Sequence, residues 1–146
     1  MNLAGSTLFL FALGTLYATT GTLNMADMAV KVRELDPGDG ALVMVGATML
    51  LIVFAVKAAA FPVQFWLPAT YANAPAPVAA LFAIMTKVGA YAIIRVYTLI
   101  FPPDTAATAD LFSVWLMPAA LVSLAIGMAG VLAAKMLVRL VAFSVI

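Results

Sequence analysis

The sequence predicts an all-α integral membrane protein, a polytopic helical bundle with about four transmembrane helices and the start of a fifth. Three observations carry this prediction. Of the 146 residues, 66% are hydrophobic and only 9% are charged, whereas about a quarter of the residues in a soluble domain are charged. The mean hydropathy is +1.18. The apolar residues also fall into four runs, each long enough for the roughly 20 residues that a crossing helix needs.

The same composition excludes several classes of function. Seven basic and six acidic residues leave a net charge of only +1, so no long-range field would attract nucleic acid. The sequence contains no cysteine and no histidine, which removes disulfides, haem and zinc ligation, and histidine-based acid–base catalysis. We therefore expect no cofactor and no metal site. Any proton chemistry must use lysine, carboxylate or water.

The first predicted span covers residues 3–20 and is followed by the main aqueous connection, residues 21–40. Asn24 is placed to cap a short helix over residues 25–35, in which apolar residues recur at the i, i+3, i+4 spacing of an amphipathic helix. We expect this helix to lie along the membrane surface.

The second predicted span covers residues 41–73 and is discontinuous at Pro62. Proline lacks an N–H and its ring clashes with the preceding turn, so a helix over residues 41–61 must break near this position. The stretch that follows is too apolar for a loop and too short to span by itself. We therefore expect a second, shorter half-helix to resume before Asn73.

The third predicted span covers residues 77–101 and begins with a first-turn proline, Pro77. A polar connection over residues 102–110 leads to the fourth span, residues 111–134, whose first turns Pro118 is expected to kink. Residues 135–146 open another helix. Because apolar runs begin close to Met1 and continue to the last residue, we expect a single transmembrane domain from the centre of a longer protein.

The charged residues are distributed unevenly between spans and connections. All six carboxylates lie in connections, whereas Lys57, Lys87 and Arg95 lie inside apolar runs. A lysine at the bilayer centre costs roughly 2.5–3.5 kcal/mol to insert, so such residues usually face a polar pathway. Desolvation disfavours the charged form of a lysine, which suits Lys57 and Lys87 to a proton relay.

Other roles for these three cations stay open. Lys57 is near enough to the expected helix end to extend toward an interface, and both lysines are able to pair with a neighbouring subunit in a purely structural role. Arg95 stays charged, and we expect it to anchor its helix at an interface or to lie beside the pathway.

Polar side chains follow the predicted break at Gln64, Thr70 and Asn73, and Lys57 precedes Pro62 by five residues. Interrupted backbone at membrane depth is tolerated only where it is buried in protein or lines a wet cavity. Transporter sites are typically built from such discontinuous helices. The sequence therefore predicts a hydrated path beside the break.

The residues around the break also resemble a known family. The stretches that carry the likeness are KAAAFPVQFWLP (57–68), PAP (75–77) and TKVG (86–89). They resemble the antiporter-like subunits that Mrp-type multisubunit cation/proton antiporters share with the membrane arm of respiratory complex I. Together with GTLNMAD (21–27), they are most similar to the D subunits of the Mrp antiporters.

The resemblance implies roles for particular residues. Lys57 and Lys87 would lie on the proton route, and Lys57 would pair with a glutamate on a helix that precedes residue 1. Arg139, within LVRLVAFS (137–144), matches a basic position at the start of a later helix of the family, while Val138 stands where a second basic residue is usual.

The resemblance also implies a function. We expect a proton-translocating subunit of a Na⁺ or K⁺/proton antiporter, a secondary transporter and not an enzyme, assembled with the other antiporter subunits in the bacterial inner membrane. The alternatives are a proton-pumping subunit of the complex I type and a non-transporting membrane scaffold. No acidic or carbonyl cage for a metal ion is present in the pattern, so Na⁺ and K⁺ both stay open.

The basic residues give no clear membrane orientation. Lys31 and Arg33 on one side balance Lys135 and Arg139 on the other. Because residues 102–110 contain no basic side chain, we expect the Lys135 side to be cytoplasmic.

Overall fold

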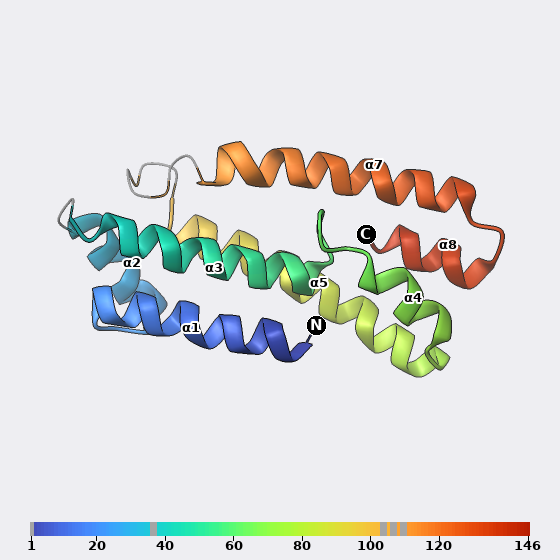
Figure 1. Cartoon of the computed structure of the whole chain (residues 1–146), viewed down its shortest axis with the longest axis horizontal. Coiled ribbons are helices and arrows are strands. Elements are labelled where there is room, and N and C mark those ends of the chain that lie inside the picture. Colours follow the sequence, from blue (N-terminus) through green and yellow to red (C-terminus); the bar gives the residue numbers. More distant parts are fainter. Residues whose placement is uncertain (1, 36–37, 103–104, 106–107, 109–110) are drawn as a thin grey trace.

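The computed structural model describes residues 2–35, 38–102, 105, 108 and 111–146, and these residues form helices and their connections, without strands. Most of the helices run roughly along one long axis (Figure 1). Their bounds are α1 Asn2–Thr20, α2 Met25–Glu34, α3 Gly40–Ala58, α4 Trp66–Asn73, α5 Ala76–Leu99, the π-helical turn η1 Phe112–Leu116, α7 Met117–Ala133 and α8 Leu137–Ser144.

Four helical stretches in the described part of the chain are long and apolar enough to cross a membrane. These stretches are Leu3–Thr20, Gly40–Ala58, Ala76–Leu99 and Val114–Ala133. Large apolar side chains also cover the outside of the bundle, with Leu3 82% and Leu132 86% exposed. An exposed apolar surface of this extent suits lipid or neighbouring helices, not water. The predicted all-α polytopic membrane fold is thus confirmed.

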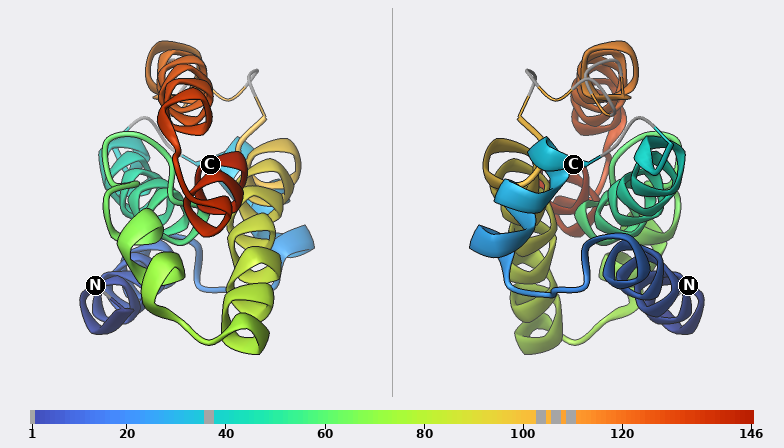
Figure 2. Two further views of the ribbon diagram at one scale, coloured as in Figure 1. Left: turned by 90° about the vertical axis from the view of Figure 1, so that its right-hand side faces the viewer. Right: turned by 90° about the vertical axis from the view of Figure 1, so that its left-hand side faces the viewer.

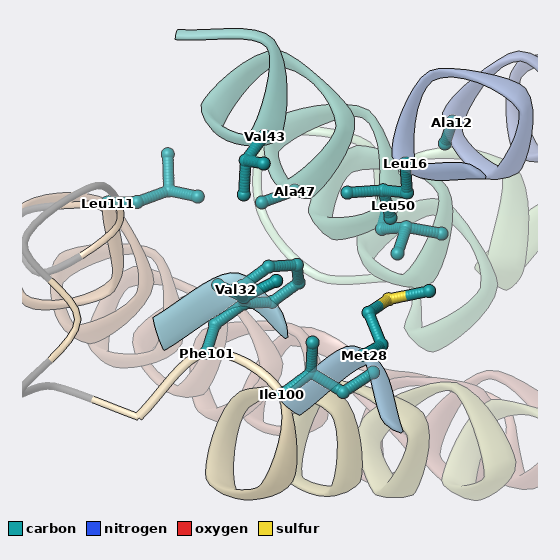
Figure 3. Close-up of a cluster of buried hydrophobic side chains, with 10 residues drawn as sticks. All are labelled: Ala12, Leu16, Met28, Val32, Val43, Ala47, Leu50, Ile100, Phe101 and Leu111. Carbon is teal, nitrogen blue, oxygen red and sulfur yellow. The ribbon is translucent and has the colours of Figure 1, made fainter. Parts of the chain in front are cut away.

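The main hydrophobic core lies where α1, α2, α3 and the end of α5 meet (Figure 3). α1 and α3 pack side by side and run in opposite directions (Figures 1 and 2). Gly46 on α3 allows this contact, because a Cβ atom there would lie 2.8 Å from the Leu16 side chain. The buried members of the core are Ala12, Leu16, Met28, Val32, Val43, Ala47, Leu50, Ile100, Phe101 and Leu111.

The amphipathic helix predicted after the first span is present as α2. Asn24 caps it as expected, because its side-chain oxygen accepts a hydrogen bond from the Ala26 N–H at 3.0 Å. Met28 and Val32 on its apolar face are buried in the main core. The apolar face of α2 therefore closes one end of the bundle.

The interruption of the second span is confirmed, but the helix ends earlier than predicted. α3 stops at Ala58, three residues before the predicted end at Phe61, and α4 begins at Trp66. The ring of Pro62 would clash with the carbonyl four residues back, which belongs to Ala58, and the residue before a proline is disfavoured in the helical region. Pro68 lies in the first turn of α4, where a missing N–H has no helical partner to lose.

The prolines of the later spans also act where expected. Pro77 lies in the first turn of α5. Pro118 lies in the first turn of α7, directly after the π-helical turn η1. A proline at 118 cannot donate to the carbonyl of Val114, which explains the wider turn at this point.

After α7 the chain reverses, and α8 runs back along it (Figure 1). α8 lies on the inner side of α7 and packs against α7 and α4 (Figures 1 and 2). The predicted connection over residues 102–110, with Asp104 and Asp110, falls mostly outside the described residues, as do Asp36 and Pro37.

Candidate functional site

The broken end of α3 has a defined backbone geometry. The Ala60 N–H donates to the Ala55 carbonyl at 2.9 Å, and the Ala59 N–H donates to the Val56 carbonyl at 3.3 Å. This pair of bonds is a Schellman motif, and it requires Ala59 to adopt a left-handed conformation, with φ 54° and ψ 41°. A non-glycine residue in this region is strained, and such strain is often found at functional sites.

Two further hydrogen bonds fix the chain around the break. The Trp66 indole N–H, at the start of α4, donates to the Val56 carbonyl in the last turn of α3 at 3.1 Å. The Phe61 N–H donates to the hydroxyl of Ser123 on α7 at 2.7 Å. The break is therefore tied both to the following half-helix and to a helix far along the sequence.

Lys57 lies in the last turn of α3, one residue from its end, and not four residues from it as the sequence predicted. A cation here is favoured by the partial negative charge at the C-terminus of a helix. Its side chain is half-buried and borders an open groove of about 380 Å³ between α1 and α3. The other residues that line this groove are Gly5, Ser6, Phe9, Leu10, Val53 and Phe54.

Gly89 brings the broken end of α3 against the middle of α5. A Cβ atom on Gly89 would lie 2.5 Å from the Ala58 nitrogen and 2.8 Å from the Lys57 carbonyl carbon. Such distances do not occur for real Cβ atoms, so only glycine permits this approach of one backbone to another. The terminal turn that carries Lys57 therefore lies at about half the length of α5.

Lys87 lies at the same level, since it is the twelfth of the 24 residues of α5. Residues two apart on a helix are about 200° apart around its axis, so Lys87 is on a different face of α5 from Gly89. Its side chain is exposed in this chain, and its ammonium group donates to the Val145 carbonyl, just after α8, at 3.2 Å. The end of α3 that carries Lys57 thus meets α5 at the level of Lys87, but on a different face of α5.

The three polar residues predicted to follow the break do not converge on one path. Gln64 lies in the break and is 2% exposed, and neither atom of its amide has a hydrogen-bond partner among the described residues. Thr70 and Asn73 are exposed on α4, and each donates back to a carbonyl of that helix, Trp66 at 2.6 Å and Ala69 at 2.9 Å. Of these three residues, only Gln64 is a buried polar group that lacks a partner among the described residues.

Two other predicted residues lie away from the break. Arg95 is exposed on α5, four residues before its end, and Arg139 is exposed in the first turn of α8. Pro62 is itself exposed.

Reasoning from the residue pattern missed two contributors to this site. Ser123 is one hydroxyl in an apolar span, and such a serine is normally a packing residue that bonds its own helix. Gly89 was noticed only within the TKVG motif. Neither position has a sequence pattern that predicts its contact partner, because each contact joins segments far apart in the sequence.

The arrangement is an interrupted transmembrane helix with one lysine on its broken end and another at the same level of α5, and discontinuous helices of this kind are typical of polytopic membrane transport proteins. The family model described as "NADH:quinone oxidoreductase/Mrp antiporter, TM" matches residues 1–146, and the chain belongs to this family.

Curated relatives agree with this membership. The chain is 46% identical over 146 residues to the D subunit of an Na⁺/H⁺ antiporter of Bacillus subtilis (strain 168), and the match covers 99% of this chain and 28% of the relative. It is 43% identical over 146 residues to the D subunit of a probable K⁺/H⁺ antiporter of Rhizobium meliloti (strain 1021), with 100% of this chain and 27% of the relative covered. The chain thus spans less than a third of the length of these relatives.

A solved structure is also similar. It is the membrane-bound sulfane sulfur reductase, an archaeal respiratory membrane complex, with a TM-score of 0.85 and 31% identity. The match covers 98% of this chain and 28% of the matched chain. The fold around the break is therefore shared between proteins named as antiporter subunits and a respiratory membrane complex.

Proposed function

We propose that this chain forms part of the proton pathway of a multisubunit monovalent cation/proton antiporter in a bacterial inner membrane. Lys57 takes up and releases protons at the broken end of α3, and Lys87 passes them onward within α5. The other subunits of the complex are its partners, Na⁺ or K⁺ is the exchanged cation, and the chain carries out no covalent chemistry.

The observation that carries this proposal is the contact between Gly89 and the Lys57–Ala58 backbone, with a Cβ distance of 2.5 Å to the Ala58 nitrogen. It sets the end of α3 against the centre of an apolar span, where a lysine is costly unless a polar pathway accepts it. In a chain that spans only 27–28% of its relatives, both lysines are partly or fully exposed, and we propose that other segments enclose them.

Because the helix end that carries Lys57 contacts the Gly89 face of α5 and Lys87 lies on a different face, a proton passing between the two lysines needs an intermediate group. Gln64 supports a hydrated route, since a buried amide without a partner is a place where an ordered water is expected. Thr86, buried on the same face of α5 as Gly89, offers a hydroxyl oxygen as a second polar group. We assign both residues to a water-assisted connection between Lys57 and Lys87.

The proposal is tested with the full-length protein and its companion subunits, in inverted vesicles from a host without other cation/proton antiporters. A respiratory substrate first acidifies the vesicle interior, and a pH-sensitive dye reports the gradient. We expect added Na⁺ or K⁺ to dissipate that gradient, and vesicles from the empty host to show no such response.

A second candidate function is a proton-pumping subunit of a respiratory complex, which is favoured by the similarity to the archaeal respiratory complex. Under that function the purified complex would create a proton gradient when given an electron donor, and added Na⁺ or K⁺ would not dissipate an existing gradient. This result would contradict the antiporter proposal.

A further inference from the structure

The last backbone N–H group before Pro62 belongs to Phe61. In a continued α-helix its N–H would donate to the carbonyl of Lys57, four residues back. Here it donates instead to the Ser123 hydroxyl on α7, at 2.7 Å. The N–H groups of Ala59 and Ala60 are already used by the Schellman motif. Ser123 therefore takes the one donor that would extend α3 beyond its present end.

The Ser123 hydroxyl is oriented for this task by its own helix. Its proton is donated to the Ala119 carbonyl at 2.8 Å. A serine hydroxyl has one proton and two lone pairs, so with the proton engaged, the lone pairs are available to accept from Phe61. The serine is 6% exposed, so water does not compete freely for this position.

The hydrogen bond also lies at the middle of a predicted membrane span. Ser123 is the tenth of the 20 residues in the apolar stretch Val114–Ala133. An unpaired N–H at this level would find no water in the surrounding lipid, so the acceptor on α7 determines whether the break is stable there.

We propose that Ser123 is a positioning residue that holds α3 open after Ala58, with Lys57 on the terminal turn. The serine does not exchange protons. It fixes the geometry of the helix end from which Lys57 acts, by accepting the Phe61 N–H. The functional part of this inference rests on the proposed role of Lys57, whereas its structural part does not.

The test compares Ser123→Ala with Ser123→Thr in the assembled full-length complex. Alanine removes the acceptor, whereas threonine keeps a hydroxyl that can make both bonds. Ser144→Ala is the matched control, because the Ser144 hydroxyl donates to the Val141 carbonyl of its own helix at 2.8 Å and is exposed. Two quantities are measured: hydrogen–deuterium exchange of the peptide that contains Phe61, and the initial rate of cation/proton exchange.

For Ser123→Ala we expect amide exchange in residues 59–65 to become about tenfold faster, because the Phe61 donor loses its acceptor in the native state. We expect transport to fall about fivefold or more, because the helix end that carries Lys57 loses a hydrogen bond that positions it. Ser123→Thr should restore both quantities to within about twofold, and Ser144→Ala should change neither. Ser123→Cys, which keeps the size but offers a weak acceptor, should resemble alanine and replaces it if alanine prevents assembly.

Unchanged amide exchange and unchanged transport in Ser123→Ala or Ser123→Cys would overturn the inference. Faster amide exchange without loss of transport would also overturn it, because the position of the helix end would then not matter to Lys57. Failure of the proposed function itself is seen separately, as full transport by a Lys57→Ala variant. In that event the amide exchange still decides whether Ser123 holds the break.

Discussion

Gly89 and Ala58 approach each other so closely that a Cβ atom on Gly89 would lie 2.5 Å from the Ala58 nitrogen. The contact is between backbones, so no side-chain rotation can relieve it. It brings the helix end that carries Lys57 to the centre of α5, which carries Lys87. A glycine here is therefore a geometric requirement for placing the two lysines at one level.

Gly89→Ala should separate the end of α3 from α5 and reduce cation/proton exchange about tenfold or more, since overpacking a tight contact typically costs about 1–3 kcal/mol. The matched control is Gly14→Ala on α1, where a Cβ atom would meet nothing within 4 Å. That change should leave transport intact and favour the helix. Initial transport rates in vesicles, normalised to assembled complex on an immunoblot, compare the two variants, and equal rates would exclude a role for this contact.

Gln64→Met should lower transport while leaving assembly unchanged. Methionine keeps the approximate size of the side chain but removes an amide that lacks partners among the described residues. If Gln64 holds a water on the proton route, its loss interrupts that route, whereas a merely structural amide without partners should be replaceable at little cost. Thr70→Ala is the control, because the Thr70 hydroxyl is exposed and bonds its own helix. Transport by Gln64→Met at the level of Thr70→Ala would remove Gln64 from the route.

Trp66→Phe should loosen the connection between α3 and α4. The indole N–H that donates to the Val56 carbonyl at 3.1 Å is lost, and one such hydrogen bond contributes about 1 kcal/mol. We expect a lower temperature of thermal inactivation of the complex. The control is Trp115→Phe, since Trp115 is 68% exposed and surface changes usually stay within about 0.5 kcal/mol. An equal effect of both substitutions would show that the indole bond does not hold the break.

Single cysteines at Asp39 and Lys135 should be labelled from opposite sides of the membrane. Asp39 directly precedes α3 and Lys135 lies between α7 and α8, and Figure 1 shows the start of α3 and the turn from α7 to α8 at opposite ends of the bundle. The chain has no cysteine of its own. Both residues are exposed, and we expect the Lys135 side to be cytoplasmic. In intact cells an impermeant maleimide should therefore label the cysteine at 39 and spare the one at 135. Labelling of both would refute an odd number of membrane crossings between the two positions.

The local signals in the sequence predicted much of this fold. Proline chemistry located the break near Pro62 and the start of α5 at Pro77, and the side chain of Asn24 marked the start of α2. These features depend on residues next to one another in the chain, so a local rule is sufficient to find them.

The end of α3 was misplaced because its geometry lacks the usual mark. A Schellman end normally carries glycine at the left-handed position, but here that residue is Ala59. Three alanines in a row predict a continued helix. The hydrogen bond that fixes Phe61 is made to Ser123, 62 residues away, so no local sequence pattern indicates it. Lys57 was consequently predicted to lie four residues before the helix end, whereas it lies one residue before it.

Lys57 and Lys87 are predicted to relay protons. The helix geometry alone does not establish this role, so it is tested by substitution. Lys57→Ala and Lys87→Ala should each abolish or sharply reduce exchange, because alanine offers no group to carry a proton. Arg95→Lys is the control, since Arg95 is exposed near the end of α5 and the change preserves its charge.

The most direct measurement is the cation-induced collapse of the proton gradient in inverted vesicles that contain the assembled Lys87→Ala complex. We expect Lys87→Ala to retain less than about a tenth of the wild-type rate, because water alone would have to bridge the gap left at the centre of α5. Arg95→Lys should retain more than about half, as expected for a conservative change at an exposed position. Wild-type exchange by Lys87→Ala at normal assembly would contradict the account and leave this lysine with a structural role only.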